Sequence, residues 1–162
     1  MKRLFIIVPI LLCLCSCKGG DIHPKLTEIS FTAELTYYNE TYVLEAEVDK
    51  NATLSATIKE PETLKNLNLT VNSKGITAEY LGLKYNANEA TLPFSKTVWD
   101  AYLPLYHIIT SGAVADKSGV IEGQTENLKY SLTVSPTGLP QELNLKNKRL
   151  SVRFYNTEIK EE

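Results

Sequence analysis

Strict alternation of apolar and polar residues begins after Glu28 and limits the folds open to this chain more than any other feature. The apolar positions are Ile29, Phe31, Ala33, Leu35 and Tyr37, and the residues between them are polar or amphipathic. This period of two is the pattern of a strand that is buried on one face. Because the same alternation returns over residues 42–48 and 54–59, three consecutive antiparallel strands are predicted.

Further strands follow along the chain, separated by turn-forming residues. They are predicted near 67–71, 76–80, 81–85, 119–124, 128–134, 139–145 and 149–155. Pro61, the Asn72–Gly75 segment and the run of Pro136, Gly138 and Pro140 interrupt the pattern. The sequence therefore predicts a mainly β domain with nine or ten antiparallel strands and short connections.

One segment has helical spacing instead. Ser95 is a predicted helix cap and Gly112 a predicted end, and the apolar residues between them are Val98, Ala101, Tyr102, Leu105, Ile108 and Ile109. Pro104 lies inside this segment, which predicts a kink or a division into two short helices. Two roles are open for the helix: it completes the core against the sheet, or it forms a lid over an apolar cavity.

The first residues are typical of an export signal. Lys2 and Arg3 precede eleven apolar residues, Leu4–Leu14, and this run is too short for a bilayer, which needs about 20. The sequence Leu14-Cys15-Ser16-Cys17 resembles a bacterial lipobox. That resemblance implies cleavage before Cys17 and lipidation of its thiol with diacylglycerol or palmitate, and hence a lipid-anchored protein on the extracytoplasmic face of the cell membrane. The alternative is an ordinary secretory signal.

These features divide the chain into three parts. Residues 1–16 are the predicted lipoprotein signal peptide, 17–27 a lipidated tether and 28–162 a single β domain. Gly19, Gly20 and Pro24 predict that residues 18–27 form a flexible coil. Cleavage would also remove Lys2 and Arg3, leaving 15 basic against 19 acidic residues and no basic run, so nucleic acid is not an expected partner.

The cysteines and the polar residues suggest no catalytic or metal site. All three cysteines lie at or before residue 17, so the predicted mature domain has no disulfide. Asp100 and His107 are seven residues apart, about 10 Å along a helix, which is too far for a triad with Ser111. No metal-ligating cluster or phosphate loop is present, and Glu45 and Glu47 fit a solvated strand face. The expectation is a non-enzymatic protein without a cofactor.

Several segments resemble the lipoprotein-carrier-like (LolA/LolB-like) domains. They are residues 57–67, 75–83, Leu92-Pro93, 138–143 and the last strand, 150–156. The resemblance implies an unclosed, strongly curved antiparallel half-barrel with a helix against its concave face. The family's soluble carriers begin with a long N-terminal helix and use an arginine on an early strand to fasten the lid. In this chain no long helix precedes the first strand, and the only arginines after the signal, Arg149 and Arg153, lie on or beside the last strand. Shuttling of lipoproteins is therefore not expected.

Two functions remain open for such a domain. In the first, it is a binding module for an apolar or lipid-like ligand on the concave face, with a binding site formed by Leu35, Leu44, Ile58 and Leu69 beneath Trp99, Leu103 and Ile109. In the second, it is a protein-interaction or envelope-assembly factor whose cavity is filled by its own helix. An open cavity would favour the first function and an exposed, unpaired strand the second.

Overall fold

A computed structural model describes residues 20–87 and 93–160 of the chain. It contains ten strands, one α-helix, α1 (Pro93–Ser111), and a short 3-10 helix, η1 (Glu62–Leu64). The strands are β1 (Ile29–Tyr37), β2 (Glu40–Val48), β3 (Leu54–Glu60), β4 (Asn68–Asn72), β5 (Gly75–Tyr80), β6 (Leu83–Ala87), β7 (Val120–Gln124), β8 (Lys129–Val134), β9 (Pro140–Leu145) and β10 (Leu150–Ile159). The predicted fold class, a mainly β domain with one helix, is confirmed.

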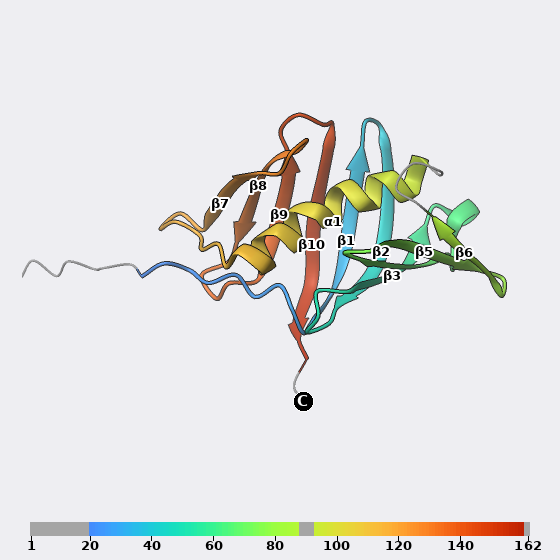
Figure 1. The fold of residues 1–162 in the computed structure, drawn as a ribbon, viewed down its shortest axis with the longest axis horizontal. Coiled ribbons are helices and arrows are strands. Elements are labelled where there is room, and N and C mark those ends of the chain that lie inside the picture. Colours follow the sequence, from blue (N-terminus) through green and yellow to red (C-terminus); the bar gives the residue numbers. More distant parts are fainter. Residues whose placement is uncertain (1–19, 88–92, 161–162) are drawn as a thin grey trace, which may run out of the picture.

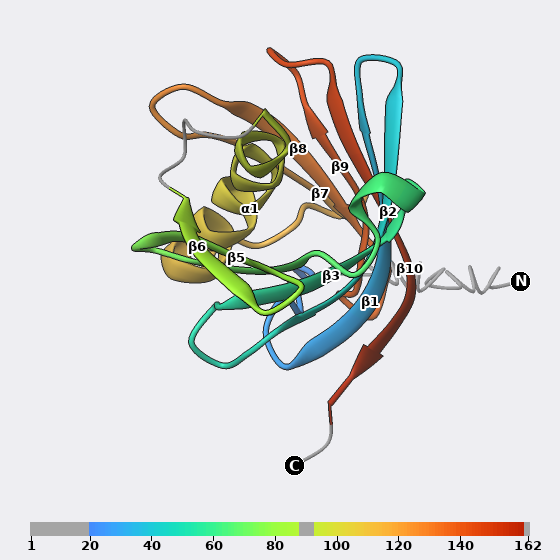
Figure 2. The ribbon, with the colours of Figure 1, turned by 90° about the vertical axis from the view of Figure 1, so that its right-hand side faces the viewer.

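All ten strands belong to one antiparallel, unclosed sheet in the order β6-β5-β4-β3-β2-β1-β10-β9-β8-β7. The first and last strands are neighbours at its centre, while β6 and β7 form the two edges. The sheet is strongly curved, and α1 lies across its concave side (Figures 1 and 2). No helix among the described residues combines the length and the apolar character that crossing a bilayer requires.

The core lies between the sheet and one side of α1. The predicted alternation of β1 is observed, with Ile29, Phe31, Ala33 and Leu35 buried. From the helix, Val98, Ala101, Tyr102, Leu105 and Ile108 are buried against the sheet. Tyr102 also donates a hydrogen bond from its hydroxyl to the carbonyl oxygen of Ala52, at 2.9 Å, so the polar end of this ring is satisfied inside the core.

The helix differs from its prediction at two points. It begins at Pro93, so Ser95 is a buried residue of its first turn and not the cap. It also runs without interruption through Pro104, so the predicted division into two helices is wrong. The side chain of Pro104 is fully buried, and packing of this kind offsets the lost backbone hydrogen bond. The end is as predicted, with Gly112 at a φ of 65° directly after Ser111.

The segment before β1 is packed against the domain from Ile22 onward. Ile22 forms an antiparallel bridge with Ala115, and the amide of Lys25 donates to the carbonyl oxygen of Gly138 at 2.8 Å. Leu26 is buried in the core. Residues 22–27 are therefore fixed, in contrast to the free coil that their composition predicts. Cys17 and the signal segment lie outside the described residues.

Candidate functional site

The concave face contains all seven of the predicted ligand-binding residues, and they pack against one another as core. Leu35, Leu44, Ile58 and Leu69 are buried in the sheet, whereas Trp99, Leu103 and Ile109 are half-buried on α1. A cavity of about 30 Å³ lies between the sheet and the helix residues Val98, Ala101, Tyr102 and Leu105, and it is lined by apolar side chains. Sites for drug-sized ligands have about 300–1,000 Å³. In this arrangement the helix itself occupies the concave face.

Trp99 has one unusual feature within this packing. Its indole Nε1 is buried and has no hydrogen-bond partner among the described residues. The ring lies 5.9 Å from that of Tyr102, which in turn lies 5.7 Å from the ring of Tyr106. A buried N–H without an acceptor is costly, by about 1–3 kcal/mol. Trp99 is therefore the one residue of the predicted site whose polar group is left unsatisfied.

The residues considered for a triad each have a different partner. Asp100 forms an ion pair of 3.6 Å with Lys96, four residues earlier on the helix, and a second of 3.6 Å with Lys148, which joins the helix to the β9–β10 connection. His107 shares a hydrogen bond of 2.8 Å between its Nδ1 and the Tyr130 hydroxyl. Ser111 donates to the carbonyl of Ile108 at 3.4 Å. Over the described ranges, no group of three or more His, Cys, Asp and Glu side chains is placed to hold a metal ion.

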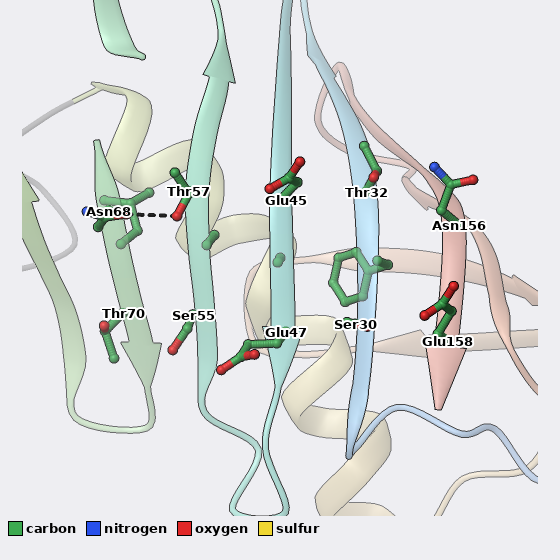
Figure 3. A pocket seen from close by; sticks show the side chains of 14 residues that line it. Ser30, Thr32, Glu45, Glu47, Ser55, Thr57, Asn68, Thr70, Asn156 and Glu158 are labelled. Carbon is green, nitrogen blue, oxygen red and sulfur yellow. Dashed lines mark hydrogen bonds between the residues drawn. The ribbon is translucent and has the colours of Figure 1, made fainter. Parts of the chain in front are cut away.

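The convex face carries a broad polar hollow of about 540 Å³ (Figure 3). Polar side chains project from the sheet in two rows that follow the strand register, one row across all five strands that the hollow spans and the other across four of them. One row contains Thr70, Ser55, Glu47, Ser30 and Glu158, and the other contains Asn68, Thr57, Glu45 and Thr32.

Four of the polar side chains in this hollow have side-chain partners within the chain. Glu45 forms an ion pair of 2.6 Å with Lys59, and Glu47 forms one with Lys160. The Thr57 hydroxyl donates to Asn68 Oδ1 at 2.7 Å. The exposure of Glu45 and Glu47 agrees with the predicted solvated strand face. Because the lysines balance these carboxylates, the hollow presents hydroxyl groups and one further acidic side chain, Glu158, to solvent.

The β5–β6 hairpin carries the most exposed apolar side chains of the described residues. Leu81 is 85% exposed and Leu83 78%, and the rings of Tyr85 and Tyr80 are 49% and 40% exposed. We call these four residues the hairpin surface. Isolated exposed apolar residues are ordinary, but a cluster of large ones on a single hairpin makes that hairpin a candidate binding surface.

The strand register explains how these side chains gather. Tyr80 pairs with Leu83, and Ala78 pairs with Tyr85. The side chains of these two pairs therefore point to the same face of the sheet. Ala78 is buried on the concave face, whereas Tyr80, Leu83 and Tyr85 are exposed. The apolar face of the sheet therefore continues past the part that α1 buries and emerges into solvent at the hairpin.

The turn of the hairpin is strained. Leu81 and Gly82 connect the two strands and have φ values of 50° and 80°, which are those of a type I′ turn. Glycine and asparagine suit such positions, whereas leucine pays about 1–2 kcal/mol to adopt a left-handed conformation. Leu81 is also almost fully exposed, so no burial of its side chain offsets the cost of its backbone conformation. Uncompensated strain of this kind is found at binding surfaces.

The outer edge of β6 is unpaired in the part of the chain that the structure describes. An edge strand presents free backbone N–H and C=O groups, on which another strand can form. The opposite edge, β7, is polar, and Glu122 at its centre forms an ion pair with Lys146 at 2.6 Å. Of the two sheet edges, β6 is thus the one that combines free backbone groups with exposed apolar side chains.

Sequence reasoning did not single out this hairpin, because residues 81–85 were assigned to one strand. The signal was nevertheless present. An apolar residue stands at 80, 81, 83 and 85 around Gly82, and the alternation continues on both sides of that glycine.

Comparison of the chain with protein-family models, with curated protein sequences and with solved structures found no match.

Proposed function

We propose that this chain is a membrane-anchored extracytoplasmic lipoprotein that acts as a protein-interaction module through its β5–β6 hairpin. One observation carries the proposal: four large apolar side chains are exposed beside a sheet edge that no described residue covers. The lipobox-like sequence ending at Cys17 supports the anchor. The filling of the concave face by α1 supports an outer surface, and not an internal cavity, as the binding site.

The position of the tether supports the same assignment. Ile22 is bridged to Ala115 beside the β7 side of the domain, and β6 lies at the opposite side (Figure 1). Cys17 precedes Ile22 by five residues, which span at most about 18 Å. An anchored domain would therefore keep its β7 side near the membrane and leave the hairpin surface open to a partner.

The binding mode that suits this surface is strand addition. An extended segment of the partner would form backbone hydrogen bonds with β6, and its alternate side chains would contact Tyr85 and Leu83. Backbone pairing supplies affinity in this mode, and the contacts of alternate side chains supply specificity.

A lipid-like ligand on the concave face is the second candidate function. The resemblance to lipoprotein-carrier-like domains and the unsatisfied Nε1 of Trp99 favour it. Since the enclosed space is only about 30 Å³, α1 would have to move away from the sheet to admit an acyl chain. The binding of a ligand would then be coupled to opening of the helix.

A photo-crosslinking amino acid at position 81 tests the protein-interaction proposal. Leu81 lies at the tip of the hairpin, and Ser73, in the β4–β5 turn, is an exposed control position on the same half of the sheet. Irradiation of cells that express the full chain should give a protein adduct from position 81 and none from position 73. Equal yields from both positions, or no adduct at position 81, would contradict the proposal.

A further inference from the structure

We infer that the partner of the hairpin surface is a second copy of this chain, with the two β6 strands paired antiparallel about a two-fold axis at Tyr85. The inference rests on the proposed function, because it names the partner of the same surface. It is carried by the self-complementary pattern of β6, whose sequence is Leu83-Lys84-Tyr85-Asn86-Ala87.

The hairpin geometry identifies which backbone groups of β6 are free. In a two-residue turn, the flanking residues form a hydrogen-bonded pair, and here these are Tyr80 and Leu83. Bonded and non-bonded pairs then alternate along an antiparallel ladder. Tyr85 therefore bonds toward β5, whereas the backbone groups of Lys84 and Asn86 point to the open edge.

Only one two-fold register uses both of these residues without a clash of charge. Centred on Tyr85, the pairing places Lys84 opposite Asn86 of the second copy on both sides of the axis. Centred on Lys84, it would place two lysines opposite each other, and like charges in that arrangement are destabilising. Centred on Asn86, it would leave the backbone groups of Lys84 without a partner in β6, which ends at Ala87.

The side chains agree with this register. Directly opposite residues of a ladder share a face, so the Tyr85 rings of the two copies would meet on the apolar face. They would form a non-bonded pair, in which the side chains approach most closely. Leu83 and Tyr80 lie on that same face of each copy, so the two hairpin surfaces would join into one apolar strip. Lys84 and Asn86 would pair on the polar face.

Pairing through five residues gives a small interface. Association in solution should therefore be weak, since stable complexes bury about 1,200–2,000 Å² in total. Anchoring at one membrane raises the effective concentration of the copies and favours the pair. The test must accordingly trap a transient contact at a defined register.

Single cysteines on β6 provide that trap. In the inferred register the Tyr85 Cα atoms of the two copies lie about 4.5 Å apart, which is within the range of a disulfide. The two Leu83 positions lie about 14 Å apart, because each faces position 87 of the other copy, four residues further along the strand. Leu83→Cys is a matched control, since Leu83 is more exposed than Tyr85 and would be favoured by random collision.

The experiment oxidises membranes that contain the full-length chain with copper phenanthroline and measures the disulfide-linked dimer. Tyr85→Cys should give at least a fivefold higher dimer yield than Leu83→Cys, and the unsubstituted chain sets the background. Similar yields from the two variants, or a higher yield from Leu83→Cys, would overturn the inference. An adduct with another protein at position 81 would still support the proposed function.

Charge at position 86 provides a second, register-specific measurement. In the Tyr85→Cys background, Asn86→Asp places a carboxylate opposite each Lys84 of the other copy and should raise the dimer yield severalfold. Asn86→Lys places two lysines opposite each other and should lower the yield. No change, or the opposite order, would show that Lys84 and position 86 do not pair, and the inferred register would be rejected.

Discussion

Ile22 and Ala115 hold each other by two backbone hydrogen bonds, with 3.3 Å from the Ile22 amide to the Ala115 oxygen and 2.9 Å in the return direction. This pair joins the segment before the first strand to the residues just after α1. The tether and the end of the helix are therefore mechanically connected. A pull on the predicted lipid anchor would act first on this end of the domain.

Gly138 fixes the same segment, and its replacement should release it. A Cβ at Gly138 would lie 2.2 Å from the carbonyl oxygen of His23, at a φ of 87°. Gly112→Ala is the control, because Gly112 also has a positive φ, 65°, but open space around it. We expect a loss of about 1 kcal/mol for Gly112→Ala and at least about 3 kcal/mol for Gly138→Ala in urea unfolding. Trypsin cleavage at Lys25 should accelerate only in Gly138→Ala. Equal effects of the two substitutions would mean that the clash is relieved elsewhere.

Truncation of an inward-facing leucine should distinguish the two faces of the sheet. Leu69 is fully buried on β4, whereas Glu45 projects into the polar hollow from β2. Leu69→Ala should lower the free energy of unfolding by about 2–5 kcal/mol. Glu45→Ala should change it by less than about 0.5 kcal/mol, since its ion pair with Lys59 is exposed. Denaturant titrations that reverse this order would indicate a strand register shifted by one residue.

Alkaline pH should weaken the fold through Tyr102. Burial, with smaller contributions from Tyr106 and Asp49, raises the pKa of Tyr102 from 10.0 to about 12. Above pH 10 the unfolded chain loses this phenolic proton while the folded chain retains it, so the free energy of unfolding falls between about pH 10 and 12.

Tyr102→Phe removes that contribution, together with the hydrogen bond to Ala52. At pH 8 the variant should be less stable by about 1–2 kcal/mol. Its loss of stability between pH 10 and 11.5 should be shallower than that of the parent. If urea midpoints of the two proteins fall in parallel over that range, Tyr102 does not titrate as described.

Cys17 is the predicted site of the lipid anchor. Cys17→Ala should abolish incorporation of a fatty-acid analogue and release the protein from the membrane fraction, because two acyl chains are needed for stable anchoring. Cys15→Ala, which leaves the acceptor thiol in place, should label as the parent does. Labelling that persists in Cys17→Ala would refute the anchor.

Trp99 reports on whether α1 ever leaves the sheet. It is the only tryptophan of the chain, and its Nε1 is buried without a partner. If a fatty acid or lipid-like probe enters beneath the helix, Trp99 emission should shift in a saturable way. If α1 is a permanent part of the core, emission should stay constant until unfolding. A titration with several amphiphiles that leaves the spectrum unchanged would remove the lipid-binding candidate.

The period-two pattern was sufficient to predict the sheet. It predicted the strands β1 to β5, their inward residues and the wet face that carries Glu45 and Glu47. The starts of β6 and α1 were not predicted. Leu81 extends the alternation of Leu83 and Tyr85 but lies in a turn, and the helix begins at Pro93, ahead of a plausible cap at Ser95. Local patterns do not encode the distant packing that decides such positions.

The features that matter for the site were harder to predict. The attachment of Ile22 to Ala115 joins residues 93 positions apart and leaves no local signal. Likewise, sequence spacing predicted that Leu35 and Leu44 face the core, where both are buried, but it could not show that the cavity between them and the helix measures only about 30 Å³. Cavity volume depends on the summed shapes of side chains from several strands and the helix, which no single stretch of sequence specifies.

The pairing of β1 with β10 has a consequence for the order in which the sheet can form. Ile29 pairs with Ile159, and Tyr37 with Leu150, so the two strands at the middle of the sheet come from opposite ends of the domain. The sheet cannot assemble across this pair of strands until residues 150–159 are available, so its completion must wait for almost the whole domain. In an exported chain, which the signal-like first residues predict, this pair would stay open until the last strand has followed, so the domain would not close around its helix during translocation.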